Sequence, residues 1–159
     1  MTTTAAMHAM LGNATNATPT FFSGLSDAEL AAILAPLERK QFAAGTTVLV
    51  EGEQRHAMYV VEAGTADVFI SDRQGGERRV GRIGPGATIG EMALFTGQPA
   101  SATVRATTDL HVWVLSEHDF LRTAATFPRI YHNLGAILSE RLARTNRHAL
   151  YTVPGQAVV

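Results

Sequence analysis

The sequence predicts a mainly β protein with flanking helices: an antiparallel, jelly-roll-like β roll with an N-terminal helix and a long C-terminal helix. Three observations carry this prediction. Residues 41–116 alternate apolar and polar side chains over short stretches that turn residues separate. On both sides of this region, apolar residues recur three or four positions apart, as along one face of a helix. Helices and strands do not alternate regularly, which argues against a parallel, nucleotide-binding sheet.

The first predicted helix covers residues 26–35. Ser26 and Glu29 have the spacing of a capping box, in which each side chain bonds the other residue's backbone N–H. Apolar residues follow along one face: Leu30, Ile33, Leu34 and Leu37. This pattern predicts a short amphipathic helix that begins at Ser26.

The middle region is predicted to hold the strands. Six stretches fit: 47–50, 58–61, 66–70, 79–83, 102–106 and 110–115. Turn signals separate them: Ala44-Gly45, Ala63-Gly64, 72–76, Gly84-Pro85-Gly86 and 107–109. This short spacing is typical of an antiparallel roll or barrel. The glycines of residues 84–90 lack the G-x-G-x-x-G order, so a proline turn explains them better than a dinucleotide loop.

After Ser116 the helical period returns. Ser116 and Asp119 are spaced to cap a short helix, and Pro128 suits the first turn of a longer one that runs to about residue 149, roughly 30 Å. The apolar stripe of the longer helix consists of Ile130, Leu134, Ile137 or Leu138, Leu142 and Thr145. This stripe is expected to pack on the roll and on a second copy of the helix, which predicts a homodimer.

One domain, residues 20–150, is expected, with a mobile arm over 1–19 and a loose tail or linker over 151–159. The N-terminal residues lack the pattern of a signal peptide, and no stretch approaches the ~20 apolar residues of a membrane span. The chain has no cysteine, which fits a reducing compartment, and a cytoplasmic location is expected.

Charge and motifs exclude several functions. With a net charge of −1 and scattered basic residues, direct nucleic-acid binding is not expected. The six histidines form no metal-binding pair, and no nucleophile elbow, Walker loop or acid pair is present. No metal, no cofactor and no enzymatic activity are therefore expected. A cupin-type enzyme is an alternative, against which the lack of an H-x-H motif counts.

Residues 89–106, IGEMALFTGQPASATVRA, carry the clearest functional signal. With a preceding helix and a following long helix, this segment resembles the phosphate-binding cassette of the cyclic nucleotide-binding domain family, found in catabolite activator proteins, cyclic-nucleotide-dependent kinases and gated channels. Further matching segments stand in the family's order: 42–46, 51–53, 58–64 and 81–86. The resemblance covers about residues 20–147, and it implies a regulatory sensor for cyclic AMP or cyclic GMP.

The resemblance also implies a ligand site. Its residues are Gly90, Glu91, Met92, Ala93, Pro99, Ala100, Ser101, Ala102, Thr145 and Asn146. The carboxylate of Glu91 would accept a hydrogen bond from the ribose 2′-hydroxyl, and the backbone amides that follow it would face the cyclic phosphate. Ser101 would meet the phosphate through its hydroxyl and amide. Thr145 and Asn146 would read the edge of the base; solvation at a helix end is the alternative.

Ala100 departs from the family, which has arginine there. Arginine binds phosphate through a planar fork of charged donors, whereas alanine offers only its backbone N–H. Losing one partner of such a pair costs ~2–5 kcal/mol, or roughly thirty- to several-thousand-fold in affinity. Arg105 is a poor replacement, because strand alternation places it on the outer face, opposite Ala102, Val104 and Ala106. Arg78, Arg79 and Arg82 of the preceding hairpin are the other candidates.

Three explanations of Ala100 remain open. The domain is a sensor with another ligand or a weaker grip on cyclic AMP or GMP, a degenerate ligand-free module for protein–protein interaction or dimerisation, or a sensor with an engineered substitution. We favour a regulatory sensing domain with altered or impaired binding, because Glu91 and Ser101 are both retained. An output domain or partner protein outside this chain is expected.

Overall fold

The computed structural model describes the backbone of residues 21–152, and their side chains except those of Met92, Phe95, Arg141 and residues 144–152. The predicted arm (1–19) and most of the predicted tail lie outside the described residues. The elements are, in order, α2 (Asp27–Leu34), β1 (Glu38–Phe42), β2 (Thr47–Leu49), β3 (Ala57–Ala63), β4 (Ala66–Ser71), β5 (Glu77–Ile83), β6 (Thr88–Ile89), α3 (Glu91–Thr96), β7 (Thr103–Ala106), β8 (Leu110–Ser116), α4 (Glu117–Thr126) and α5 (Arg129–Thr152).

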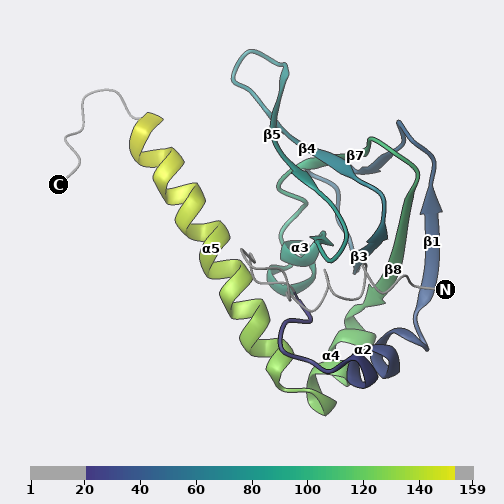
Figure 1. Cartoon of the computed structure of the whole chain (residues 1–159). Helices are drawn as coiled ribbons and strands as arrows, with labels where there is room; N and C mark the ends of the chain where they lie inside the picture. The colour runs from purple at the N-terminus through teal and green to yellow at the C-terminus, as the bar shows by residue number, and fades with distance from the viewer. Residues whose placement is uncertain (1–20, 153–159) are drawn as a thin grey trace.

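Within the described part of the chain, the strands form two four-stranded sheets, ordered β1-β8-β3-β6 and β2-β7-β4-β5. Every pairing is antiparallel. The sheets build the roll, and α2, α4 and the start of α5 gather at one end of it (Figure 1). The predicted β roll with flanking helices is confirmed.

The sequence pattern missed two strands. β1 contains the charged residues Glu38, Arg39 and Lys40, and its burial shows no alternation, because it is an edge strand with β8 as its one neighbour. β6 has only two residues, which pair with Tyr59 and Val60 of β3. A pattern of period two needs a longer strand with one covered face, and neither strand offers that.

The two faces of β3 serve two different cores. Met58 and Val60 point to the helices and join a cluster that α2, α4 and α5 cover. Tyr59 and Val61 point between the two sheets. They belong to an interior cluster of the roll with Val48, Leu49, Ala66, Ile89, Ala100, Val104, Ala106, Leu110 and Val112. The alternation of one strand thus fixes both where the helices dock and what lines the interior of the roll.

Both predicted capping boxes are present. The hydroxyl of Ser26 accepts from the N–H of Glu29 at 3.1 Å, and Ser116 accepts from Asp119 at 3.1 Å. In return, each acidic side chain accepts from the N–H of its serine, at 2.8 Å and 3.2 Å. The two boxes fix where α2 and α4 begin, and the second turns the chain out of β8 without a loop.

We expect Ser116→Ala to lower the free energy of unfolding by about 1 kcal/mol, because it leaves a first-turn N–H of α4 without its cap. A matched serine lies in the middle of α5. Ser139 is exposed, so Ser139→Ala should be neutral or stabilising by up to about 0.5 kcal/mol, since alanine has the higher helix propensity. Urea denaturation measures both variants. Equal effects of the same sign would show that the cap is not what matters at Ser116.

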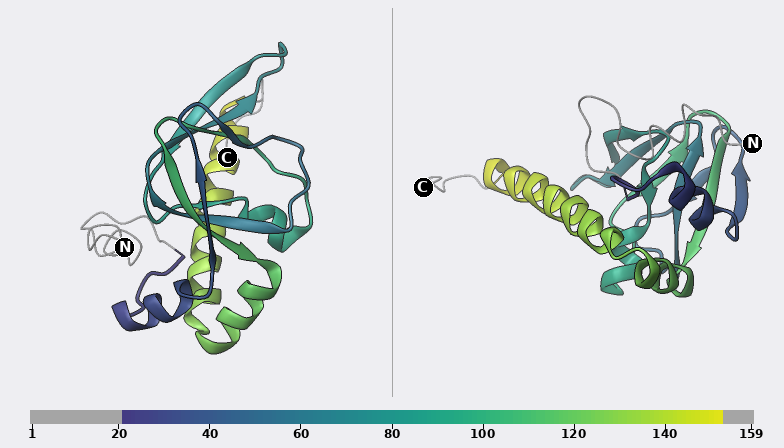
Figure 2. Two further views of the ribbon diagram at one scale, coloured as in Figure 1. Left: turned by 90° about the vertical axis from the view of Figure 1, so that its right-hand side faces the viewer. Right: turned by 60° about the horizontal axis from the view of Figure 1, so that its bottom comes forward.

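Among the side chains that the structure describes, those of the first turns anchor the long helix α5. Ile130, Leu134 and Ile137 are buried, and Asn133 donates hydrogen bonds to the carbonyls of Phe21 and Ser23 at 3.0 and 2.8 Å. The helix then leaves the roll (Figures 1 and 2). It ends at Thr152, three residues past the predicted end.

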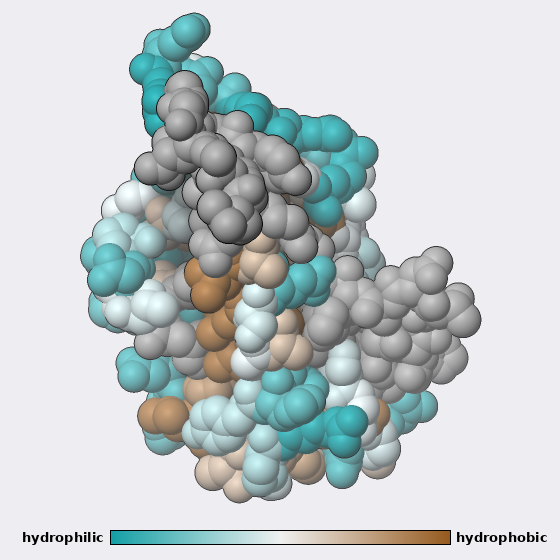
Figure 3. All heavy atoms as spheres, turned by 90° about the vertical axis from the view of Figure 1, so that its left-hand side faces the viewer, coloured by the Kyte–Doolittle hydropathy of each residue, from teal (hydrophilic) through white to brown (hydrophobic). Residues whose placement is uncertain are grey.

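Leu142, a member of the predicted apolar stripe of α5, does not pack on the roll; packing of the stripe on a second copy of the helix stays a prediction. This side chain is 62% exposed, because the part of α5 that carries it projects past the sheets (Figure 2). Figure 3 looks onto the side of the molecule where α5 lies and shows a band of apolar surface there.

Candidate ligand-binding site

The cassette predicted from the sequence, residues 89–106, connects the two sheets: it runs from the end of β6 in one sheet through α3 to the end of β7 in the other. Gly90 and Gly97 flank α3, with φ of 81° and 68°. These left-handed conformations are readily open only to glycine. They let the chain enter and leave a helix of six residues, so the glycines of the motif determine its path.

Glu91 is the first residue of α3, and its side chain is buried, with 1% of the residue's surface exposed. Ala93 is also buried, and Leu94 packs against the helix-covered core. The side chain of Met92 lies outside the described ones. A carboxylate is rarely buried to this extent unless it has polar partners, so α3 holds an acidic group in the interior of the protein.

At the other end of the cassette, Ala100 is buried in the interior cluster of the roll, whereas Pro99 and Ser101 are exposed and Ala102 is half-buried. The N–H of Ala100 donates to the carbonyl of Glu53 at 2.9 Å. The backbone N–H of Ala100 is thus engaged by the turn before β3, and the predicted contact of Ala100 with a ligand stays a prediction.

Three of the arginines near the cassette in sequence are engaged by carboxylates on the outer face: Arg79, Arg82 and Arg105. Arg105 forms a two-pronged ion pair with Glu77, at 2.6 and 2.8 Å, as strand alternation predicts. Asp67 binds Arg82 at 2.8 Å and lies 3.6 Å from Arg79.

The pKa values of these groups follow the contacts. The hydrogen bond from Arg82 holds the pKa of Asp67 below its usual value, and the hydrogen bond from Arg105 does the same for Glu77. In return, the hydrogen bonds to Asp67 and Glu77 raise the pKa of Arg82 and Arg105. Arg82 and Arg105 each have a carboxylate partner on the surface, so neither side chain is directed into the roll.

A basic residue that the sequence did not single out lies beside the interior cluster. Arg55, in the turn between β2 and β3, donates from Nη1 to the hydroxyl of Tyr59 and from Nη2 to the carbonyl of Val48, both at 2.8 Å. No periodicity marks this position, because it lies in a turn. Arg55 becomes a candidate only because the turn that carries it pairs with the end of the cassette.

Thr145 and Asn146 lie in α5, but their side chains lie outside the described ones. Their proposed contact with a base stays a prediction.

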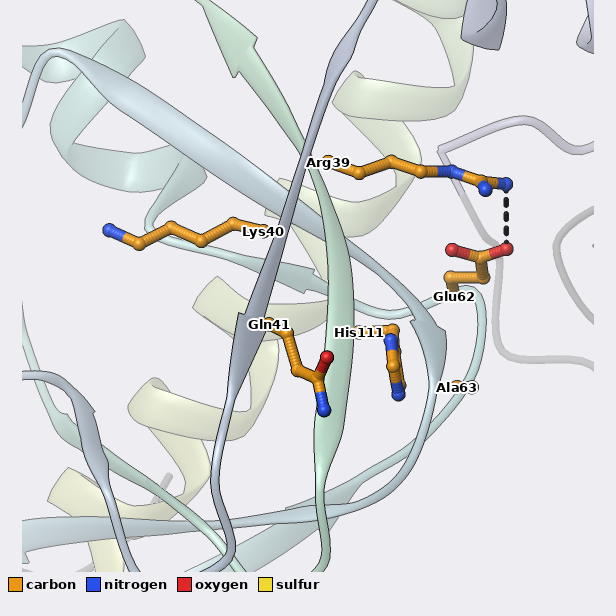
Figure 4. A pocket seen from close by; sticks show the side chains of 6 residues that line it. All are labelled: Arg39, Lys40, Gln41, Glu62, Ala63 and His111. Atoms are coloured by element: carbon orange, nitrogen blue, oxygen red, sulfur yellow. Dashed lines mark hydrogen bonds and ion pairs between the residues drawn. The ribbon is translucent and has the colours of Figure 1, made fainter.

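A separate hollow of about 480 Å³ lies over β1, β8 and β3. It is lined by Arg39, Lys40, Gln41, Glu62, Ala63 and His111 (Figure 4). Arg39 bonds Glu62 at 2.8 Å, and the Lys40 side chain points the other way (Figure 4). None of the predicted ligand residues lines this hollow.

The described residues hold neither a cluster that could bind a metal ion nor a helix that could cross a membrane. No three His, Asp or Glu side chains there converge to hold a metal ion. No helix among the same residues has the length and apolar character needed to cross a membrane.

Comparison with known proteins gives a consistent result. The family model of the cyclic nucleotide-binding domain matches residues 39–127. The cyclic AMP receptor protein of Thermus thermophilus is 31% identical over 76% of this chain and 56% of its own length. The regulatory subunit of the cAMP-dependent protein kinase of Eremothecium gossypii is 33% identical over 64% of this chain and 21% of its own length. The chain thus spans little more than half of the first relative and a smaller part of the second.

Among solved structures, the catabolite activator protein of Thermus thermophilus superposes with a TM-score of 0.77 and 30% identity. The match covers 83% of this chain and 62% of that one.

Proposed function

The chain belongs to the cyclic nucleotide-binding domain family, and from this membership we propose that it is a regulatory sensor domain for cyclic AMP or cyclic GMP, with binding altered or impaired by Ala100. The names of its relatives, a receptor protein and a kinase regulatory subunit, support a regulatory rather than a catalytic role. The absence of cysteine supports a cytoplasmic location.

The observation that carries the proposal is the buried carboxylate of Glu91 at the position where the family has its ribose-binding glutamate. A buried carboxylate is costly to desolvate, so a chain with no use for it would gain by replacing it. A ribose hydroxyl is a suitable donor to such a group.

Transmission of the signal would use the contact between α3 and the helices. Leu94 of α3 packs against the core that also contains Phe120 of α4 and Ile130 of α5. A ligand that prefers one position of α3 would therefore favour one arrangement of α4 and α5, which is a population shift. An output domain or partner outside this chain would read the position of α5.

The exposed part of α5 supports the proposal of a homodimer. Leu142 is 62% exposed on a helix that leaves the roll, and a second copy of α5 would cover such a side chain.

The alternative is a ligand-free domain kept for protein–protein interaction or dimerisation. The burial of Ala100 among apolar side chains favours it, because no guanidinium enters the roll from this position.

Calorimetric titration with cyclic AMP and cyclic GMP tests the proposal on the unmodified chain and on Ala100→Arg. We expect binding by at least one of the two proteins. Tight binding by the unmodified chain would contradict an impaired site and would require another group to hold the phosphate. Binding by the variant alone would identify a sensor that lacks one residue. No binding by either folded protein would contradict the sensor and favour the interaction module.

A further inference from the structure

We propose that Arg55, from the turn between β2 and β3, supplies the phosphate-binding charge that Ala100 lacks. This inference rests on the proposed function and specifies its ligand contact: the anionic cyclic phosphate. It assigns the contact to a residue outside the cassette.

The backbone places the turn of Arg55 against the end of the cassette. The N–H of Gly52 donates to the carbonyl of Ala100 at 2.8 Å, and the N–H of Ala100 donates to the carbonyl of Glu53 at 2.9 Å. Arg55 follows Glu53 by two positions. The residue that departs from the family is thus paired with the turn that carries the arginine.

The same segment then passes the start of the cassette. A Cβ atom at Gly90 would lie 3.6 Å from the carbonyl oxygen of Ala57, and Tyr59 pairs with Ile89. Arg55 therefore lies between two segments that contact the cassette. The segment before it, at Gly52 and Glu53, pairs with the cassette's end, and the segment after it, at Tyr59, pairs with the cassette's beginning.

The guanidinium of Arg55 is directed toward the interior of the roll. Its two hydrogen-bond partners, the carbonyl of Val48 and the hydroxyl of Tyr59, belong to residues that are 2% and 6% exposed. The guanidinium carbon lies 5.5 Å from the centre of the Tyr59 ring. Val48 and Tyr59 share the interior cluster with Ala100, so this cation binds two residues of the cluster in which Ala100 lies.

The guanidinium also has donors to spare. Arginine has five N–H donors, and two hydrogen bonds from Arg55 are present. Its Nε is buried and has no hydrogen-bond partner among the described residues, although it forms an ion pair at 3.5 Å with the carboxylate of Glu53, whose side chain is 42% exposed. A buried donor without a partner is unfavourable, and a phosphate oxygen would satisfy it in the manner of other arginine–phosphate contacts.

The test is calorimetric titration of the full chain with cyclic AMP, comparing Arg55→Gln with the exposed control Arg122→Gln. We expect Arg55→Gln to weaken binding by roughly thirtyfold or more, because a half-buried, charged partner of the phosphate is lost. Arg122→Gln should leave the affinity unchanged within about threefold, since exposed charges contribute little. Arg55→Lys should fall between, because lysine keeps the charge without the fork.

A double-mutant cycle distinguishes phosphate binding from a structural brace. If Arg55 replaces the missing arginine, Ala100→Arg should add more affinity in the Arg55→Gln protein than in the unmodified chain. Adenosine, which lacks the phosphate, should bind both Arg55→Gln and the unmodified chain equally. If Arg55→Gln weakened the binding of adenosine as much as that of cyclic AMP, the inference would be overturned. A folded double variant, with Arg55→Gln and Ala100→Arg, whose affinity for cyclic AMP is not restored would overturn it too.

The remaining outcomes separate this inference from the proposed function. If the unmodified chain binds and Arg55→Gln changes the affinity by less than about threefold, the sensor stands and Arg55 is not its phosphate ligand. Binding by Ala100→Arg alone overturns the role of Arg55 in the same way. No binding by either protein removes the proposed function and this inference with it. Should Ala100→Arg fail to fold, the affinities of Arg55→Lys and Arg55→Gln for cyclic AMP and for adenosine decide whether Arg55 binds the phosphate.

Discussion

Replacing Glu91 with glutamine is expected to weaken cyclic AMP binding by roughly ten- to a hundredfold, because a hydrogen bond to a charged group contributes about 1.5–3 kcal/mol. Glutamine has nearly the same shape, so the buried position at the start of α3 stays filled. What changes is the charge of the acceptor that would meet the ribose 2′-hydroxyl. Calorimetric titration measures the affinity.

The 2′-deoxy form of cyclic AMP provides the control for this prediction. Because it has no 2′-hydroxyl, its weaker binding should be nearly the same for the unmodified chain and for Glu91→Gln. Glu38→Gln, on the exposed strand β1, should leave both affinities unchanged. If Glu91→Gln weakened both nucleotides to the same extent, the carboxylate would be supporting α3 rather than binding ribose.

Gly64→Ala is expected to lower the free energy of unfolding by about 3–5 kcal/mol, an effect at the upper end for a single substitution. Gly64 lies in the turn between β3 and β4 with φ of 94°. A Cβ atom there would lie 2.2 Å from the carbonyl oxygen of Asp109. This oxygen belongs to backbone, so it cannot move aside as a flexible side chain would.

The surrounding hydrogen bonds hold the two turns together. Thr107 donates its N–H to the carbonyl of Thr65 at 2.9 Å, and the N–H of Thr65 donates to the hydroxyl of Thr108 at 3.0 Å. Relief of the clash would break this contact between the β3–β4 turn and the β7–β8 turn.

Gly45→Ala is the matched control. Gly45 has a similar φ of 86°, but a Cβ atom there would meet no atom within 4 Å. Only the conformational cost of about 1–2 kcal/mol is expected for it. Urea denaturation of both variants separates the two contributions. Equal losses of stability would show that backbone conformation, and not the approach of Asp109, requires glycine at position 64.

Local signals predicted the parts of the fold that depend on residues close in sequence. The capping boxes at Ser26 and Ser116 involve contacts three residues apart, and both are present. The outward direction of Arg105 follows from the alternation of one strand. The cassette could be recognised because its glycines, its glutamate and the strand after it lie in one continuous segment.

The sequence by itself thus determined the β roll, the helix starts and the family. Tertiary structure decided which groups near the cassette are engaged and which face the interior of the roll. The N–H of Ala100 is paired with Glu53, 47 positions earlier in the chain, and Arg55 reaches the interior cluster from a turn without periodicity. Leu142 belongs to the predicted apolar stripe and is exposed because α5 extends past the roll. Periodicity reports the faces of one element, whereas these outcomes depend on which distant element lies opposite.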